Sequence, residues 1–318
     1  MPGILPFDNI TLLRAIEKAS APAETPIWSG HFLDAGIVPT ETVQADVVTG
    51  PEGLMVAISR EAEARKASRE HVDSKTFSIP RFSEKDVVTA ADLIRYRQPG
   101  TSGGMQGQAQ LIGRKLRNLV GKLNSTKEVM AIRALQGEVS DGAGNVIATF
   151  PVGNDGSVDF SSTNPRVYFD NAAVTISRAL RVARVKLVSY VGKDAYQALL
   201  LHPDVQALLD GPAGPGMLEN GELRTLHGVT IRRINGAYTD NAGNEQPYLP
   251  DDAMITTADG PYFEYYHGPC STRQGIALQP LFVDQWETPD PPAAWFRIES
   301  NPLPIVQRPE AVRKATVA

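Results

Sequence analysis

The strongest constraint on the fold of this chain is a long amphipathic pattern in its first half. From Met105 to Glu138, apolar residues recur mostly three or four positions apart, which is the spacing of one face of a helix. A glycine-rich segment precedes the pattern and Gly137 lies near its end, so we predict one helix over 105–138. Roughly 30 helical residues span about 45 Å, which is long for a globular domain. The helix is therefore expected to act as a strut that braces other elements.

Composition limits the classes of protein to which the chain can belong. A chain of 318 residues can bury a sizeable core, as one large domain or as two smaller ones. Its 27 glycines and 24 prolines predict many turns and long irregular connections. The formal net charge of -5 argues against a dedicated nucleic-acid-binding module, because such a module usually carries a basic excess.

Cysteine content and hydropathy restrict the expected cellular setting. Cys270 is the single cysteine, so no intrachain disulfide can form and a reducing compartment fits best. The sequence shows neither a basic start followed by an apolar core nor an apolar run of about 18 residues. We therefore expect neither a secretory signal peptide nor a membrane-spanning helix.

The segments before the long helix predict an apolar arm and a hairpin. Residues 27–43 include Trp28 and have no regular period, so this arm must pack on its own domain or on a neighbouring chain. Residues 42–49 and 54–58 alternate apolar and polar side chains around a Pro-Glu-Gly turn, which predicts a hairpin. Residues 60–75 are nearly all polar or charged, which suits an exposed loop or a helix that depends on its neighbours.

The sequence after the long helix predicts short strands and helices. Two hairpins are expected over 138–162, with Gly156 in the turn of the second. Residues 228–238 and 248–257 flank a turn-rich tip and are expected to pair with each other. The other expected elements are helices at 171–184 and 194–209 and strands at 185–191, 293–300 and 309–317.

One glycine-rich segment is similar to a catalytic motif. Residues 100–104, GTSGG, resemble the Gly-Asp-Ser-Gly-Gly of trypsin-like serine proteases, so a serine hydrolase using Ser102 is one alternative function. Such a nucleophile needs a histidine base held by a carboxylate, and an oxyanion hole of backbone amides. Here Thr101 replaces the aspartate and a long helix follows. The segment is therefore better explained as a flexible lead-in to that helix.

No other pattern predicts a catalytic, cofactor or metal site. The five histidines are scattered, with no pair four residues apart and no cysteine partners, so a zinc site has little support. A soluble DNA-binding protein remains a second alternative because the long helix has a basic face, although such charge runs are more often solvated or paired. The residues of that face are Arg114, Lys115, Arg117 and Lys122.

The ordered set of segments, rather than any single motif, resembles a known family. LLRAIEK, IWSGHFL, PTETVQADVV, KTFSIPRF and VVTAADLIRYRQPG precede the long helix, and VKLVSYVGKDAYQALLLHPDVQALL, YLPDDAMI and AAWFRIESNPLPIVQRPEAVRKATV follow it. By this order the chain resembles the bacteriophage major capsid proteins of the lambda capsid-E type, which have the Hong Kong 97 coat fold. The match extends over almost the whole length.

The resemblance implies an α+β fold with a defined division of the chain. The expected parts are an N-terminal arm at 1–41, an extended loop at 42–99, a peripheral domain at 100–171, an axial domain at 172–260, and a C-terminal return to the peripheral domain at 261–318. The extended loop would be a β-hairpin that lies on a neighbouring subunit. The peripheral domain would hold its hairpins and a spine helix at 105–138.

The resemblance also implies a structural major capsid (head) protein rather than an enzyme. Copies of the chain would form hexamers and pentamers of an icosahedral shell around the phage DNA genome, first as a precursor shell that later expands. Many weak contacts would sum to a durable container. Expected partners are scaffold, portal and decoration proteins, with non-specific proximity to double-stranded DNA and no membrane. The expected locations are the virion and, during assembly, the host cytoplasm.

Two sets of residues follow as candidates for shell assembly. Expansion of a shell requires a hinge, which we place at Gly100, Gly103 and Gly104, between the extended loop and the spine helix. The basic residues Arg114, Lys115, Arg117 and Lys122 are expected to face other subunits or the lumen.

Overall fold

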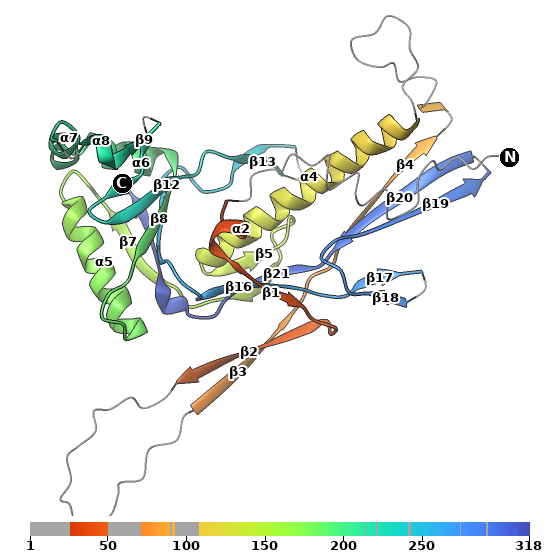
Figure 1. Cartoon of the computed structure of the whole chain (residues 1–318), viewed down its shortest axis with the longest axis horizontal. Coiled ribbons are helices and arrows are strands. Elements are labelled where there is room, and N and C mark those ends of the chain that lie inside the picture. Colours follow the sequence, from red (N-terminus) through yellow and green to blue (C-terminus); the bar gives the residue numbers. More distant parts are fainter. Residues whose placement is uncertain are drawn as a thin grey trace, which may run out of the picture.

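A long helix joins the two ends of the computed structural model of the protein (Figure 1). A mixed sheet with short helices lies at one end, an elongated sheet lies at the other, and a two-stranded ribbon projects away from both. The structure describes residues 26–49, 71–89, 91–92, 108–212, 214–220, 222–240, 243–273, 275–290 and 292–318.

The long helix is confirmed as α4, Gln108–Leu135, which has 28 residues. Its predicted first residues, 105–107, lie outside the described residues. The helix ends three residues before the predicted position, because Gly137 adopts a φ of +98° and Glu138 already begins strand β5. Glycine adopts this left-handed conformation without steric cost and therefore commonly terminates helices.

The N-terminal half of α4 packs on an elongated antiparallel sheet of order β19-β20-β4. The strands are β4, Phe82–Thr89; β19, Phe282–Pro289; and β20, Pro292–Ser300. Side chains alternate across the sheet, so that Val88, Phe296 and Ile298 are buried in the same cluster as Leu111 and Leu116 of the helix. This separate apolar cluster holds the strut to the sheet.

The mixed sheet contains strands from distant parts of the chain, in the order β11-β12-β8-β15-β22-β7. Their bounds are β7, Gly153–Val158; β8, Leu187–Val191; β11, Thr225–Leu226; β12, Val229–Arg233; β15, Ala253–Ala258; and β22, Val312–Val317. The predicted buried strand is β8, in which every residue is buried. The sheet thus combines strands from three of the expected parts of the chain, 100–171, 172–260 and 261–318.

Short helices accompany the mixed sheet. Helix α5 begins six residues earlier than predicted, because the side chain of Asn164 accepts a hydrogen bond from the backbone N–H of Arg166 and Pro165 occupies the first helical position. The helices are α5, Pro165–Leu180; α6, Lys193–Leu201; α7, Pro203–Leu209; and α8, Gly214–Met217. Pro203 separates α6 from α7, which divides the predicted helical region 194–209 into two.

The predicted hairpin between 42–49 and 54–58 was wrong. Strand β2, Thr42–Thr49, instead pairs along its whole length with β3, His71–Ser78, in a two-stranded antiparallel ribbon. Residues 54–58 lie outside the described residues. The polar segment 60–75 was a poor candidate for a strand because only Val72 in the paired part of it is apolar.

Two further predicted hairpins were wrong in their pairing. Gly156 has a φ of +72° but sits at a register shift within β7, which runs parallel to β22. Strands β12 and β15 both pair with β8, and the turn-rich tip belongs to a shorter hairpin of β13, Ala237–Thr239, and β14, Glu245–Pro247. Alternation identifies a strand but does not identify its partner.

The remaining elements connect these layers. The sheet of order β1-β16-β21 lies under the middle of the molecule, with β1, Leu33–Ile37; β16, Phe263–His267; and β21, Pro302–Val306. The hairpin predicted directly after α4 is confirmed as β5, Glu138–Ser140, and β6, Val146–Thr149. The other elements are α2, Trp28–His31; β9, Leu218–Glu219; β10, Glu222–Leu223; β17, Cys270–Thr272; β18, Gly275–Ala277; and the 3-10 helix η1, Pro309–Ala311.

Candidate interaction surfaces and buried anchors

The predicted basic face of α4 is partly used within the subunit. Lys115 Nζ lies 2.9 Å from Asp86 Oδ1 and donates to the Val87 carbonyl at 2.7 Å, and Lys122 pairs with Glu84. Both carboxylates belong to β4, so these lysines fasten the helix to the elongated sheet. The Lys122 pair is largely exposed and adds little stability.

The remaining predicted site residues are two arginines on α4 and the residues of the glycine-rich segment before it. Arg114 is half-buried and Arg117 is exposed on α4. For Arg114, Lys115, Arg117 and Lys122, the expected contacts with other subunits or the lumen stay a prediction. The hinge residues Gly100, Gly103 and Gly104, together with Ser102 of the hydrolase alternative, lie outside the described residues.

The described part of the chain holds neither a metal-ligand cluster nor a membrane-spanning helix. Within it, no three His, Cys, Asp or Glu side chains are placed to hold a metal ion together. None of its helices has the length and hydropathy needed to cross a bilayer.

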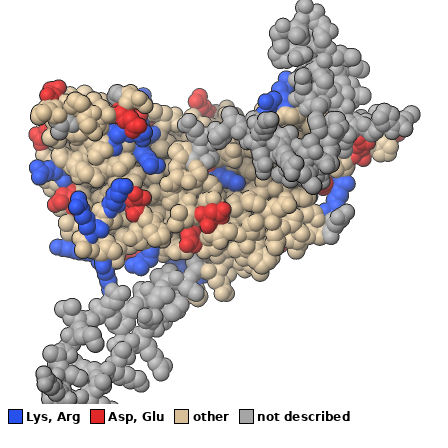
Figure 2. Space-filling model, in the orientation of Figure 1, with Lys and Arg blue, Asp and Glu red and all other residues tan. Residues whose placement is uncertain are grey.

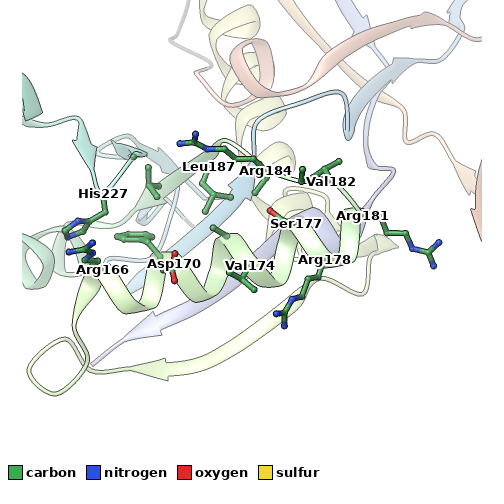
Figure 3. A pocket seen from close by; sticks show the side chains of 16 residues that line it. Arg166, Asp170, Val174, Ser177, Arg178, Arg181, Val182, Arg184, Leu187 and His227 are labelled. Carbon is green, nitrogen blue, oxygen red and sulfur yellow. The ribbon is translucent and has the colours of Figure 1, made fainter. Parts of the chain in front are cut away.

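A groove that has four arginines among its lining residues runs along α5 (Figure 3). Its volume is about 880 Å³, and its walls come from α5, the loop after it and the β11–β12 turn. Figure 3 shows Arg178 and Arg181 projecting from the C-terminal part of the helix, and Arg166 beside His227 at the other end. Helix α5 lies at the lower left of Figure 1, and the space-filling view of Figure 2 has the same orientation. There, Lys and Arg side chains (blue) gather at the lower left, and Asp and Glu side chains (red) lie at the upper left edge.

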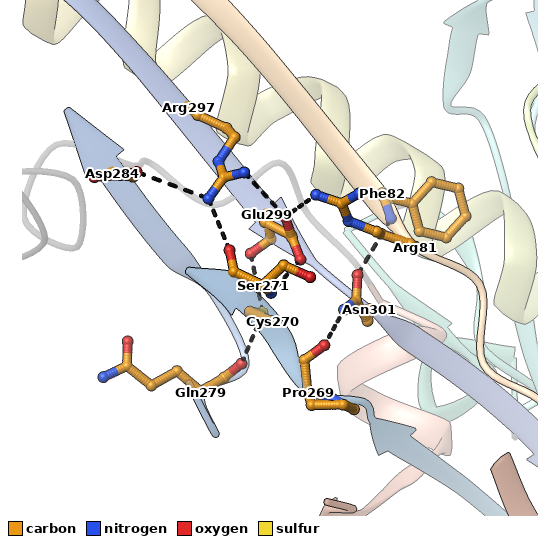
Figure 4. Close-up of polar contacts among 10 residues, drawn as sticks. All are labelled: Arg81, Phe82, Pro269, Cys270, Ser271, Gln279, Asp284, Arg297, Glu299 and Asn301. Carbon is orange, nitrogen blue, oxygen red and sulfur yellow. Dashed lines mark hydrogen bonds and ion pairs between the residues drawn. The ribbon is translucent and has the colours of Figure 1, made fainter. Parts of the chain in front are cut away.

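A buried carboxylate holds the junction between β4, β17 and β20 (Figure 4). The side chain of Glu299 has no exposed surface; it accepts a hydrogen bond from Arg81 Nη2 at 2.8 Å and one from the Ser271 N–H at 2.6 Å. Burial, the largest single effect, would raise the pKa of Glu299. The hydrogen bonds from Arg81 and Ser271 and the charges of Arg81 and Arg297 outweigh burial and leave the pKa below its usual value.

Neighbouring side chains extend this junction into a network. Arg297 Nη2 donates to the Ser271 carbonyl at 2.7 Å, and Asn301 accepts from the Phe82 N–H at 3.3 Å. Cys270 is buried beside it, and burial, followed by the charge of Glu299, raises the pKa of its thiol to about 11. A thiol that stays protonated is a poor nucleophile. The cluster is therefore suited to joining strands rather than to covalent chemistry.

The apolar arm docks on its own subunit through a second buried carboxylate. Glu128 of α4 is 1% exposed, and its two oxygens accept the backbone N–H groups of Ile27 and Trp28, each at 3.0 Å. Burial raises the pKa of Glu128, and these two hydrogen bonds oppose that shift. The carboxylate satisfies donors at the start of α2 that would otherwise be unpaired.

Aromatic packing completes the docking of the arm. The Trp28 ring stacks on Tyr265 with centroids 4.6 Å apart, and Lys127 Nζ lies 5.8 Å from the centre of the Trp28 ring. Burial lowers the pKa of Lys127 to about 8. Of the two possibilities left open for the arm, its own domain is therefore the one that receives Trp28. Leu33 and Ile37 remain 51% and 38% exposed.

The β2–β3 ribbon is attached to the body only at its base among the described residues. There, Val43 is buried in the main apolar core and the Phe77 ring lies 5.5 Å from that of Phe150. The Ile79 N–H donates to the Glu41 carbonyl at 2.8 Å and continues the pairing of the two strands. Farther along the ribbon, Ser74 and Lys75 are exposed. Within the described chain, β2 and β3 pair only with each other.

Solved structures share this arrangement of strut, sheets and ribbon over nearly the whole chain. A prophage protein from E. coli CFT073, described as a capsid protein, has a TM-score of 0.68 with 12% identity, covering 98% of this chain and 99% of that one. The mature capsid of bacteriophage PhiM1 has a TM-score of 0.58 with 9% identity, covering 94% and 89%. The SrpI encapsulin of Synechococcus elongatus PCC 7942 has a TM-score of 0.54 with 12% identity, covering 98% and 96%. The molecule therefore has the α+β Hong Kong 97 coat fold of shell-forming capsid proteins, as the resemblance implied.

The sequence assigns the chain within that class. The chain belongs to the Phage major capsid protein E family, whose model matches residues 10–317. The major capsid protein of Salmonella phage Felix O1 (isolate Felix O1-VT1) is 24% identical over 330 residues, and the match covers 88% of each chain. The chain is accordingly a structural capsid protein of the virion, and many copies of it assemble into a shell.

Glu128 and Glu299 are the functional residues that sequence reasoning missed. A weak signal exists for Glu128, because it lies three and four positions before Ala131 and Ile132, on an apolar side of the helix. Glu299 gives no such signal, since its partners Arg81 and Ser271 are distant in sequence.

Proposed function

We propose that this subunit extends its β2–β3 ribbon over a neighbouring subunit as the extended loop of residues 42–99, and that hexamers and pentamers built in this way close an icosahedral shell around double-stranded DNA. The arm, peripheral domain, axial domain and C-terminal return would then correspond to 1–41, 100–171, 172–260 and 261–318. The observation that carries this proposal is that β2 and β3 pair only with each other within the described chain and that most of their described side chains are exposed.

An isolated two-stranded ribbon is marginal in water unless another surface covers it. Val43 is buried in the main apolar core and Phe77 contacts Phe150. The other described side chains of the ribbon are exposed and do not pack in their own subunit's core. Its two outer edges also present backbone groups able to pair with another chain. A neighbouring copy in a shell would supply the missing surface.

Shortening the ribbon tests this role directly. Replacing residues 46–74 by Asn-Gly keeps the pairs from Thr42–Ser78 to Ala45–Lys75 and closes them with a tight turn. The shortened subunit should keep the thermal unfolding transition of the full chain and yet give no shells in negative-stain electron microscopy. Shells in normal yield from the shortened subunit would overturn the proposal.

We also propose the wider assembly sequence implied by the family. The subunit would first form a precursor shell with scaffold and portal proteins in the host cytoplasm, and the shell would expand through the glycines at 100–104 and bind decoration proteins. It would perform no catalysis. The net charge of -5 supports a shell that encloses DNA without binding it tightly. Co-expression with the phage's assembly genes should give two particle diameters, and a single diameter throughout would argue against expansion.

A further inference from the structure

The outward side of α5 and the loop that follows it combine exposed valines with positive charge. Val167, Val174 and Val182 are 54%, 40% and 37% exposed. Exposed Arg166, Arg178 and Arg184 lie among them along the groove. We call these six residues the α5 face. Arginine beside apolar side chains is a composition enriched in protein interfaces.

The charges of the α5 face form few stabilising contacts within the described chain, and Arg178 gains only from the dipole at the last turn of α5. None of Arg166, Arg178 and Arg184 forms an ion pair with another described residue. Arg166 also lies in the first turn of α5, where the positive end of the helix dipole disfavours a cation. A local conflict of this kind suggests that the charge acts on something outside the subunit.

An edge of the same end of the molecule carries the opposite charge. Asp194 on α6, Asp210 at the end of α7 and Glu222 on β10 are exposed, and none forms an ion pair with another described residue. We call these three residues the acidic edge. A hydrogen bond of 2.8 Å from the Leu223 N–H to the Tyr196 hydroxyl joins β10 to α6. Figure 1 draws α6 to β9 at the upper left and α5 at the lower left, with strands of the mixed sheet between them.

We propose that the α5 face of one copy binds the acidic edge of the next copy, head to tail, around each ring of the shell. This inference rests on the proposed hexamers and pentamers. A ring whose members are related by rotation needs two different, complementary patches on each subunit. The α5 face and the acidic edge meet that need, since one is basic and the other acidic.

A second copy explains the α5 face better than DNA does. A phosphate backbone would leave the three valines without apolar partners. The test treats nucleic acid as an outcome that would overturn the proposal.

Charge reversal on the two surfaces is the experiment. Arg178→Glu with Arg184→Glu, and separately Asp210→Arg with Glu222→Arg, should each reduce shell yield at least about tenfold, because every ring contact is weakened at once. The control Arg178→Lys with Arg184→Lys should assemble like the unmodified chain. Each variant is first shown to keep the unfolding transition of that chain.

Mixing the two reversed subunits tests whether the contact joins different copies. In an alternating mixture each reversed α5 face meets a reversed acidic edge, so oligomers should return, although an odd-numbered ring retains one mismatched contact. Unchanged shells from either reversed subunit, or no oligomers from the mixture, would overturn the pairing. Loss of salt-dependent duplex DNA binding with normal shells would overturn it in favour of nucleic acid. If the unmodified chain forms no shells, the proposed function itself fails.

Discussion

Removal of the Glu128 carboxylate should release the arm from the strut. In Glu128→Ala, the buried N–H groups of Ile27 and Trp28 lose their acceptors, which lie at 3.0 Å in the native subunit. Each buried donor left unpaired costs about 1–3 kcal/mol, so we expect a local destabilisation of roughly 2–6 kcal/mol. Glu128→Gln keeps one side-chain carbonyl oxygen and should cost about half as much.

Amide hydrogen exchange over residues 27–32 is the direct assay, because it reports local opening rather than unfolding of the whole subunit. Exchange there should be fastest in Glu128→Ala, intermediate in Glu128→Gln and slowest in the unmodified chain. Glu138→Ala is the matched control, since Glu138 is exposed and its loss should change stability by less than about 0.5 kcal/mol. Unchanged exchange in Glu128→Ala would show that aromatic packing alone fixes the arm.

Three other predictions use the buried polar groups. Burial lowers the pKa of His31 and of His267 from 6.5 to about 4, while nearby charges of both signs act in opposite directions. Between these pH values the unfolded chain binds more protons than the folded one. Stability should therefore fall as pH drops from 6.5 to 4, by about 3 kcal/mol per histidine at roughly 1.4 kcal/mol per pH unit. Denaturant titrations should show this slope reduced in His31→Gln, and an unchanged slope would contradict the assignment. Glu299→Ala should cost about 3–5 kcal/mol because it leaves buried partners unpaired, whereas exposed Glu287→Ala should cost less than about 0.5 kcal/mol in the same denaturation assay. Native Cys270 should react with a thiol reagent only after unfolding, and rapid labelling of the folded subunit would refute its burial.

Local elements were predictable from the sequence because their signals are local. The helix α4 follows from a sustained apolar stripe, and β8 follows from a short apolar run that is buried on both faces. The partner of β2 was not predictable, because β3 is a polar strand with little hydrophobic alternation and is held in place by its pairing with β2. In the same way, the position of β22 between β15 and β7 depends on contacts between residues far apart in sequence.

The surfaces were less predictable than the fold. The basic pattern on α4 predicted contacts of Lys115 and Lys122 with other subunits or the lumen, which stay a prediction. Their partners within the subunit, Asp86 and Glu84, became apparent only in three dimensions. The arginines of the α5 face gave no sequence pattern, because the groove they line also takes residues from the β11–β12 turn.

The place of β22 has a consequence for how a subunit is made. Its six residues fill the gap between β15 and β7, and the Ala318 N–H donates to the Val158 carbonyl at 3.0 Å. A nascent chain therefore cannot close this sheet until translation has passed Val317. A prematurely terminated product would expose two unpaired strand edges to proteases instead of a finished surface. The mixed sheet, and with it a subunit able to join a shell, therefore forms only after β22 has been synthesised.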